Sequence, residues 1–296
     1  MKDEPKGAAM IKDSWQAMMD AARRLVRDWQ VLALFGAVYA VLLTALYFFS
    51  TTREASVRQV LLTLLLALLT PALFFILQAM GISYTRHAGQ SSALLSHALR
   101  NFWKLMLVSL PLILLACLMA YLFGKLQTPA RVTAQAHPQA WPTPDGWPAP
   151  SPRTGRETAQ SFAWSAFLLT AVRCWFYGLA LPLAAIHLWL AAAREGLVPA
   201  YRSAAQIIAQ AFAPQPVLIY TIGSIIFGII PCALIFTRTP AESAGLEVGL
   251  LVARVVLSLA CFLFGWIITL GALAETSLKA EAPERALDKG SAYAPA

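Results

Sequence analysis

The chain has 296 residues, of which 58% are hydrophobic and 13% are charged, and its formal net charge is +8. Soluble domains average about 25% charged and about 45–50% apolar residues. This composition excludes a soluble enzyme, a coiled coil and a disordered chain, and it predicts an integral membrane protein.

Six uncharged runs of 20 to 35 residues lie between charged residues. A helix rises about 1.5 Å per residue, so about 20 apolar residues cross the roughly 30 Å of membrane hydrocarbon. The run LLTLLLALL at residues 61–69 does not alternate between polar and apolar residues, which excludes the strands of a β-barrel. We therefore predict six membrane-spanning helices, at about residues 31–50, 60–82, 105–124, 174–193, 216–236 and 255–274.

The lysines and arginines predict how these spans are oriented, because cytoplasmic flanks of membrane helices carry an excess of both. With the N-terminus inside, the inner flanks hold 14 of them, and the outer flanks hold 9 if Arg173 and Arg254 are counted. We therefore expect a multi-pass protein of the cell membrane with both termini cytoplasmic. Its parts are a cytoplasmic amphipathic segment at 1–30, a six-helix membrane domain at 31–275 with a proline-rich outside loop at 126–160, and a cytoplasmic tail at 276–296.

An amphipathic helix is predicted ahead of the first span. Apolar side chains recur there at spacings of three and four, and charged residues occupy the opposite face. Tryptophan and arginine on such a helix suit the headgroup boundary of a membrane, and packing beneath the bundle or in a partner's groove is the alternative. The apolar stripe consists of Trp15, Met18, Met19, Ala22, Leu25, Val26 and Trp29.

Similar stripes precede the third and the fifth span. One covers residues 95–103 and includes Trp103, and the other covers residues 201–212, where Pro214 and Pro216 separate it from the span. The sequence thus predicts an all-α polytopic membrane protein whose six transmembrane helices form three hairpins, each preceded by an amphipathic in-plane helix. The three units are residues 1–82, 91–193 and 198–275.

The second stripe ends in Leu99-Arg100-Asn101-Phe102-Trp103-Lys104, an aromatic pair beside basic residues. With the threefold layout of helix and hairpin, it resembles the bacterial six-span integral-membrane domain that is attached to some glycerophosphoryl diester phosphodiesterases, and related membrane proteins. The resemblance covers about residues 12–275 in architecture and residues 95–110 in pattern. Family members that carry the phosphodiesterase have a separate soluble catalytic barrel. This sequence holds no such segment, so the resemblance implies no catalytic residue.

Arg173 and Arg254 are the candidate anion-contact residues, because an arginine within a membrane is by default a functional hypothesis. Each precedes a run of 20 uncharged residues, which already covers about 30 Å and places both guanidinium groups near the outer headgroups. We expect outer-interface anchors, and a buried anion site is the alternative, with Glu247 as the partner of Arg254. The candidate interface residues are Trp15, Trp29 and Trp103.

The sequence predicts no catalytic, cofactor-binding or metal-binding set. His187 is the one histidine in a predicted span, the cysteines lack a metal or redox spacing, and no nucleotide-binding motif is present. We expect a non-catalytic integral membrane protein, namely a scaffold, assembly factor or accessory subunit with a cytoplasmic amphipathic collar, and not an enzyme. A transporter or lipid-handling permease is the alternative, favoured by prolines within four spans and weakened by the carboxylate-free interior. The expected partners are membrane lipids and a protein at the in-plane helices, without nucleic acid, because the basic residues flank the spans.

Overall fold

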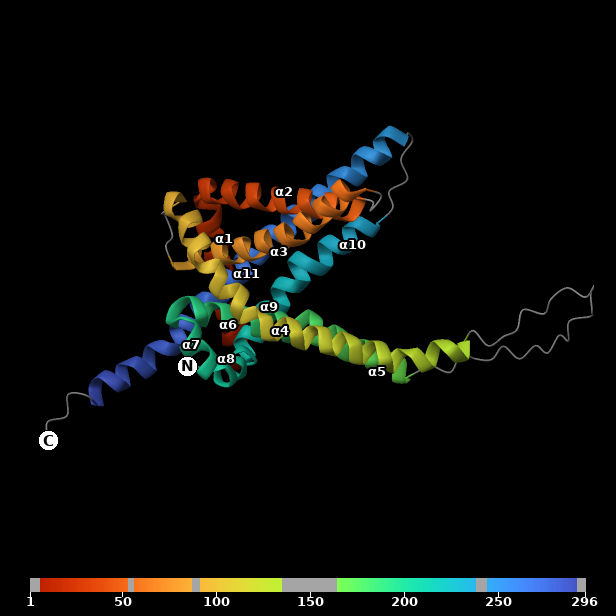
Figure 1. Cartoon of the computed structure of the whole chain (residues 1–296). Coiled ribbons are helices and arrows are strands. Elements are labelled where there is room, and N and C mark those ends of the chain that lie inside the picture. Colours follow the sequence, from red (N-terminus) through yellow and green to blue (C-terminus); the bar gives the residue numbers. More distant parts are fainter. Residues whose placement is uncertain (1–5, 53–55, 87–90, 135–163, 238–243, 292–296) are drawn as a thin grey trace, which may run out of the picture. The chain divides into compact units, whose positions relative to one another are not determined.

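The computed structural model describes residues 6–52, 56–86, 91–134, 164–237 and 244–291, and every regular element in these ranges is helical (Figure 1). Six helical runs are long and apolar enough to cross a membrane. The predicted class, an all-α chain with six helices of spanning length, is therefore confirmed. The candidate spans are Trp29–Thr51, Val57–Thr85, Ala93–Leu126, Phe167–Glu195, Pro214–Phe236 and Gly245–Leu278.

The helices fall into two compact units, each of which is described by itself. The first unit comprises Met1–Leu110 and Leu183–Ala296, and the second comprises Pro111–Pro182. The second unit contains the later part of α4, α5 (Trp164–Trp175), η1 (Phe176–Ala180) and the first residues of α6. The elements of the first unit are α1 (Lys6–Arg27), α2 (Trp29–Thr51), α3 (Val57–Arg86), the start of α4 (Ser91–Ala134), most of α6 (Leu181–Glu195), α7 (Leu197–Arg202), α8 (Ala204–Ala211), α9 (Pro214–Ser224), η2 (Ile225–Ile229), α10 (Ile230–Phe236) and α11 (Ala244–Ser291).

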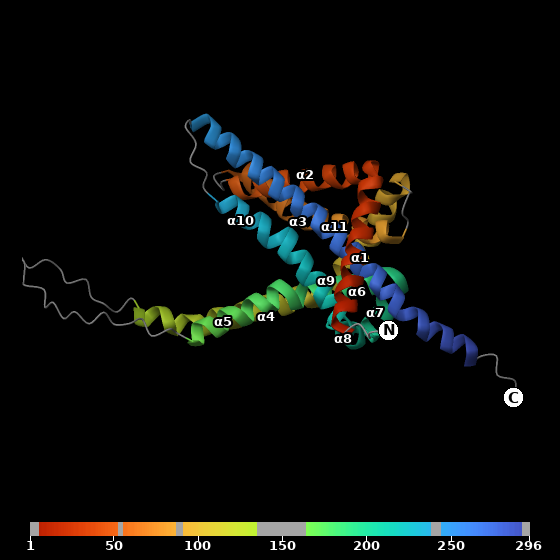
Figure 2. The same cartoon turned by 180° about the vertical axis from the view of Figure 1, so that it is seen from behind.

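Helix α11 is the central element of the first unit. It contacts α1, α3, α9, η2 and α10, and Figures 1 and 2 show it as one long helix that crosses its neighbours. Two glycines bring it close to the fifth span. A Cβ added to Gly265 of α11 would lie 2.0 Å from the Cβ of Phe227 in η2, and one added to Gly223 of α9 would lie 2.3 Å from Thr269 Oγ1. Small residues at such points let helix backbones approach, which is how helices in lipid gain van der Waals contact.

Helix α4 differs from the sequence prediction. Residues 95–103 do not form a separate in-plane helix but belong to one continuous helix, Ser91–Ala134. The reason is local, because residues 91–104 contain no proline or glycine that would end a helix ahead of the span. Breaks are present ahead of the first and the fifth span, at Asp28 between α1 and α2 and at residues 212–213 between α8 and α9. A separate helix therefore precedes the first and the fifth span but not the third.

Two helices begin well ahead of the predicted starts of the fourth and the sixth span. The fourth starts in α5 and includes Arg173, and the sixth lies in α11 and includes Arg254. Arginine is a good helix former, so a charge ends an uncharged run without ending the helix. The helices therefore extend beyond residues 174 and 255, and the starts of the spans at these residues stay a prediction.

The predicted boundaries of the loop and the tail fall inside helices. Helix α4 continues past residue 126 to Ala134, and α11 continues past residue 276 to Ser291. Residues 127–134 include two alanines, a glutamine and an arginine, and residues 277–291 include alanine, leucine and lysine. These residue types favour helix whether or not the segment is apolar. The remainder of the predicted outside loop, residues 135–160, lies outside the described residues.

The fourth and fifth spans each contain a π-helical segment just ahead of a proline. Segment η1 precedes Pro182, and η2 precedes Pro231. A proline ring clashes with the carbonyl group four residues earlier, which is that of Gly178 in η1 and of Phe227 in η2. The wider π turn relieves this clash at Pro182 and Pro231.

The second unit is a pair of helices that run side by side in Figures 1 and 2, the later part of α4 and α5 with η1. The Tyr177 hydroxyl donates a hydrogen bond to the Ala116 carbonyl oxygen at 2.7 Å, and its ring centroid lies 6.3 Å from that of Phe123. Leu114 and Leu168 are exposed, as expected of side chains that face lipid. That these two helices form a membrane hairpin stays a prediction.

Candidate functional site

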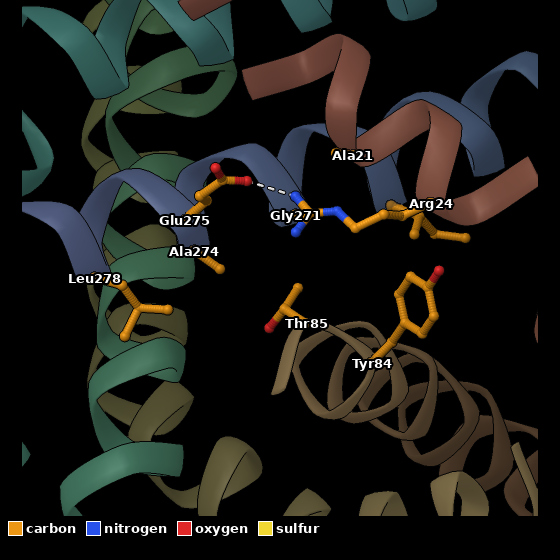
Figure 3. Close-up of a pocket in the computed structure, with 9 residues that line it drawn as sticks. Ala21, Arg24, Tyr84, Thr85, Gly271, Ala274, Glu275 and Leu278 are labelled. Carbon is orange, nitrogen blue, oxygen red and sulfur yellow. Dashed lines mark hydrogen bonds and ion pairs between the residues drawn. The ribbon is translucent and has the colours of Figure 1, made fainter. Parts of the chain in front are cut away.

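A cavity of about 90 Å³ opens between α1, α3 and α11 of the first unit (Figure 3). It has room for several water molecules or a small polar group. Four polar residues line it, namely Arg24, Tyr84, Thr85 and Glu275. Its apolar lining consists of Ala21, Ile267, Gly271, Ala274 and Leu278.

Helical spacing explains why these residues meet. On α1, Ala21 and Arg24 are three residues apart and share a face, and the last turn of α3 supplies Tyr84 and Thr85. Gly271 lets α1 approach α11, because a Cβ added there would lie 3.3 Å from the Ala21 Cβ. One stripe of α11, with spacings of four, three and four, consists of Ile267, Gly271, Ala274 and Leu278.

The polar side chains of the cavity have defined partners. Arg24 Nη2 lies 2.5 Å from Glu275 Oε2, which Figure 3 shows as a dashed line, and Arg24 Nε donates to the Asp20 carbonyl oxygen at 3.3 Å. The Tyr84 hydroxyl donates to Asp28 Oδ2 at 3.1 Å. The Arg24 and Glu275 side chains are 52% and 24% exposed, so solvent screens their ion pair and it contributes at most about 1 kcal/mol. The pair is accessible enough to exchange partners.

The cavity lies where three candidate spans have an end. One span begins at Trp29, just after α1, a second ends at Thr85 and a third ends at Leu278. These three ends therefore meet at one cavity. Ile267 lies eight residues before Glu275, about 12 Å along α11 toward the middle of the candidate span. The lining therefore changes from charged to apolar along α11, from the end of the candidate span toward its middle.

Helix α1 has three faces. Lys12, Arg23 and Arg27 are exposed and border an exposed apolar face, as their spacings of eleven and four place them on one side of the helix. The transition between packed and exposed is abrupt, since Leu25 is 1% exposed and Val26 is 66% exposed. The face packed against α11 and α9 consists of Ser14, Ala17, Met18, Ala21 and Leu25. The exposed apolar face consists of Ile11, Trp15, Met19 and Val26.

The apolar stripe predicted for α1 is thus divided between two environments. Met18 and Leu25 pack inside the unit, whereas Trp15 is exposed, as is Trp29 at the start of α2. Trp103 on α4 is exposed as well. All three candidate interface tryptophans are therefore on the surface, and their contact with a membrane or a partner stays a prediction.

Arg173 and Arg254 lie in different units and in different surroundings. Arg173 is exposed on α5. The Arg254 guanidinium donates to the carbonyl oxygen of Thr237, directly after the last residue of α10. A cation is favourable there because the C-terminal end of a helix carries partial negative charge. Helix α11 does include Glu247, yet the partner of Arg254 is this backbone carbonyl and not the Glu247 carboxylate.

Two hydrogen bonds between side chains inside the first unit were missed in the sequence. Gln78, which is 2% exposed, accepts from Trp266 Nε1 at 2.6 Å. Ser109 accepts from Trp189 Nε1 at 2.7 Å and donates to the Leu105 carbonyl oxygen at 2.7 Å. In the sequence, each of these bonds was visible only as a single amide or hydroxyl side chain within an apolar run. Lipid cannot hydrogen-bond such a group, so it indicates a partner on another helix. These bonds tie helices together.

The buried histidine bonds within its own helix. His187 Nδ1 lies 3.0 Å from the Leu183 carbonyl oxygen. In the part of the chain that the structure describes, no three histidine, cysteine or acidic side chains gather as a metal site would require. The four cysteines are free thiols.

The cavity is therefore the best-defined site, and sequence reasoning missed its polar residues. Arg24 was one of several basic residues ahead of a span, and Glu275 merely ended the last uncharged run. The resemblance to the phosphodiesterase-associated membrane domain stays a prediction. No family model matches this chain, and neither does any curated protein or solved structure.

Proposed function

We propose that this is a non-catalytic integral membrane protein, a scaffold or accessory subunit that presents α1 at the cytoplasmic surface of the membrane. The observation that supports this most is the division of α1 into a packed face, an exposed apolar face and a basic border. A helix that merely covered the bundle would need one apolar face. A second apolar face needs a further contact, which membrane lipid or a partner protein would supply.

The packed face holds α1 in a defined orientation. Ala17 and Ala21 are small enough for close contact with α11 and α9, and Leu25 fills the remaining space. The ion pair between Arg24 and Glu275 adds a polar contact to α11. Because α1 is held along one side, the direction of its exposed face is set by the fold and not by a partner.

The chemistry of the exposed face suits the surface of an anionic membrane. Trp15 and Val26 offer apolar area at the depth of the headgroup boundary. Arg23 and Arg27 border that area, and a basic residue near an anionic surface contributes about 1 kcal/mol. A partner protein that sits on the same surface would meet α1 along this face.

A lipid-handling permease or transporter is the second candidate. It is favoured by the π-helical segments η1 and η2, because broken helices often line substrate paths in transporters. The cavity beside Glu275 is a further observation in its favour. The scaffold and the permease differ in what they retain during purification.

The test is purification from membranes in a mild detergent, followed by mass spectrometry of the bound proteins and lipids. We expect a stoichiometric protein partner with the unchanged protein. Trp15→Glu and Val26→Glu should lower its recovery more than about tenfold, because they put a charge into a buried apolar contact. Gln16→Glu is the matched control, since it adds the same charge to the exposed polar face of α1 and should leave recovery unchanged.

Two results would count against the scaffold. A single retained lipid species without a protein partner would favour the permease instead. A partner recovered equally with Trp15→Glu and with Gln16→Glu would show that the exposed face of α1 is not where the partner binds.

A further inference from the structure

We propose that the cavity between α1, α3 and α11 binds the headgroup of a phospholipid in which a phosphate is joined to a primary ammonium group. This inference goes beyond the role proposed for α1, because it needs only that the spans beside the cavity cross a membrane. A volume of about 90 Å³ suffices for headgroup atoms and not for acyl chains. The chains would remain in the bilayer.

Depth and polarity point to a lipid. The charged lining, Arg24 and Glu275, lies at the ends of spans, where headgroups are. The apolar lining continues along α11 to Ile267, about 12 Å deeper. A water-soluble metabolite would not require an apolar wall that descends into the hydrocarbon, whereas a phospholipid changes from charged to apolar along the same direction.

The charges select a zwitterion. Arg24 and Glu275 neutralise each other, so the lining that they form has no net charge. An anionic headgroup would compete with Glu275 for Arg24, and a cationic ligand would compete with Arg24 for Glu275, so either would cost the ion pair between the two. A headgroup with both charges replaces one ion pair with two. The phosphate would bind the Arg24 guanidinium, which has five N–H groups and uses two in its contacts with Asp20 and Glu275.

The other polar atoms favour a primary over a quaternary ammonium. A primary ammonium donates three hydrogen bonds and needs acceptors. Glu275 offers a carboxylate, and the hydroxyl oxygens of Tyr84 and Thr85 can accept because each donates its own proton elsewhere, to Asp28 and to the Ile82 carbonyl at 2.8 Å. Figure 3 shows Tyr84 and Thr85 across the opening from the ion pair. A quaternary ammonium would instead need a cage of aromatic rings, and Tyr84 is the one aromatic residue in the lining.

The experiment is a lipid competition read by native mass spectrometry. The full-length protein in detergent micelles receives equal amounts of phosphatidylethanolamine, phosphatidylcholine and phosphatidylglycerol. We expect phosphatidylethanolamine to be retained about tenfold over each of the others, the ratio that corresponds to one charge-assisted hydrogen bond. Equal retention of the three lipids would overturn the proposal, because it would indicate lipids that merely surround the spans.

Variants of the ion pair sharpen the test. Arg24→Gln should abolish the preference, and Glu275→Gln should reverse it toward phosphatidylglycerol, because Arg24 then lacks an opposite charge. The matched controls are Arg23→Gln and Asp20→Asn, which change an exposed ion pair of 3.7 Å on the same helix and outside the lining. A phosphatidylethanolamine preference that survives Glu275→Gln would overturn the proposal.

Thr85→Val covers the case in which a charge variant fails to fold. Valine has a volume similar to that of threonine but lacks the hydroxyl acceptor, and the substitution leaves the ion pair intact. Retention of phosphatidylethanolamine should therefore fall several-fold at an unchanged melting temperature. Unchanged retention would contradict the assigned role of the hydroxyl. None of these measurements involves a protein partner, so the failure of the scaffold proposal and the failure of this one remain distinguishable.

Discussion

Gly265 illustrates how a missing side chain positions two membrane spans. Any other residue at this position of α11 would place its Cβ 2.0 Å from the Cβ of Phe227. The Phe227 Cβ is bonded directly to the backbone and cannot rotate away. A methyl group at Gly265 therefore forces α11 and the fifth span apart. The hydrophobic effect does not favour their contact in lipid, so the lost packing is not compensated.

Gly265→Ala should destabilise the protein by about 1–3 kcal/mol, the usual cost of overpacking a close contact. The measurement is the apparent melting temperature in detergent, which should fall. Gly249→Ala is the control on the same helix, because a Cβ there meets no atom within 4 Å, and it should leave the melting temperature unchanged or raise it. Equal melting temperatures for the two variants would show that α11 and η2 are not in contact as described.

At the scale of the helix, α4 shows how a proline inside a span is tolerated. Pro111 has no N–H, so the carbonyl of Leu107, four residues earlier, loses its helical partner. The Tyr201 hydroxyl on α7 donates to this carbonyl oxygen at 2.7 Å. A neighbouring helix thus supplies the hydrogen bond that the proline removes, as membrane proteins require.

Tyr201→Phe should cost about 1 kcal/mol of stability, because it leaves the Leu107 carbonyl without that donor. In a Pro111→Ala background the helix supplies its own N–H, so the same substitution should cost clearly less. A double-mutant cycle from denaturation in detergent measures the difference. If Tyr201→Phe costs the same in both backgrounds, Tyr201 does not compensate for the proline.

Helix α1 shows what apolar periodicity can and cannot predict. The spacing of three and four identifies Trp15, Leu25 and Val26 as one apolar stripe, because the backbone geometry places them on neighbouring sides of the helix. It cannot separate a side that packs on protein from a side that meets lipid, since both environments accept the same side chains. Leu25 is accordingly buried and Val26 exposed.

At the scale of the whole molecule, the number of spans could be predicted and the cavity could not. The thickness of the hydrocarbon imposes a minimum length on an apolar run, and that length is visible in one dimension. The Arg24–Glu275 pair joins residues 251 positions apart, and the Tyr84–Asp28 bond joins residues 56 positions apart. In the sequence, each of these residues is one of several polar residues at the end of a span. Only the packing of α1, α3 and α11 brings them together.

We propose a six-span membrane protein that holds α1 at its cytoplasmic surface. Because α1 and the end of the last span share one cavity, a reporter fused after Ala296 reports the side on which α1 lies. The most direct measurement compares this fusion with the same reporter inserted at Gly146, using a reporter that is active only in the cytoplasm. We predict activity after Ala296 and none at Gly146. Activity at Gly146 with none after Ala296 would place α1 on the outer side of the membrane and contradict the proposed orientation.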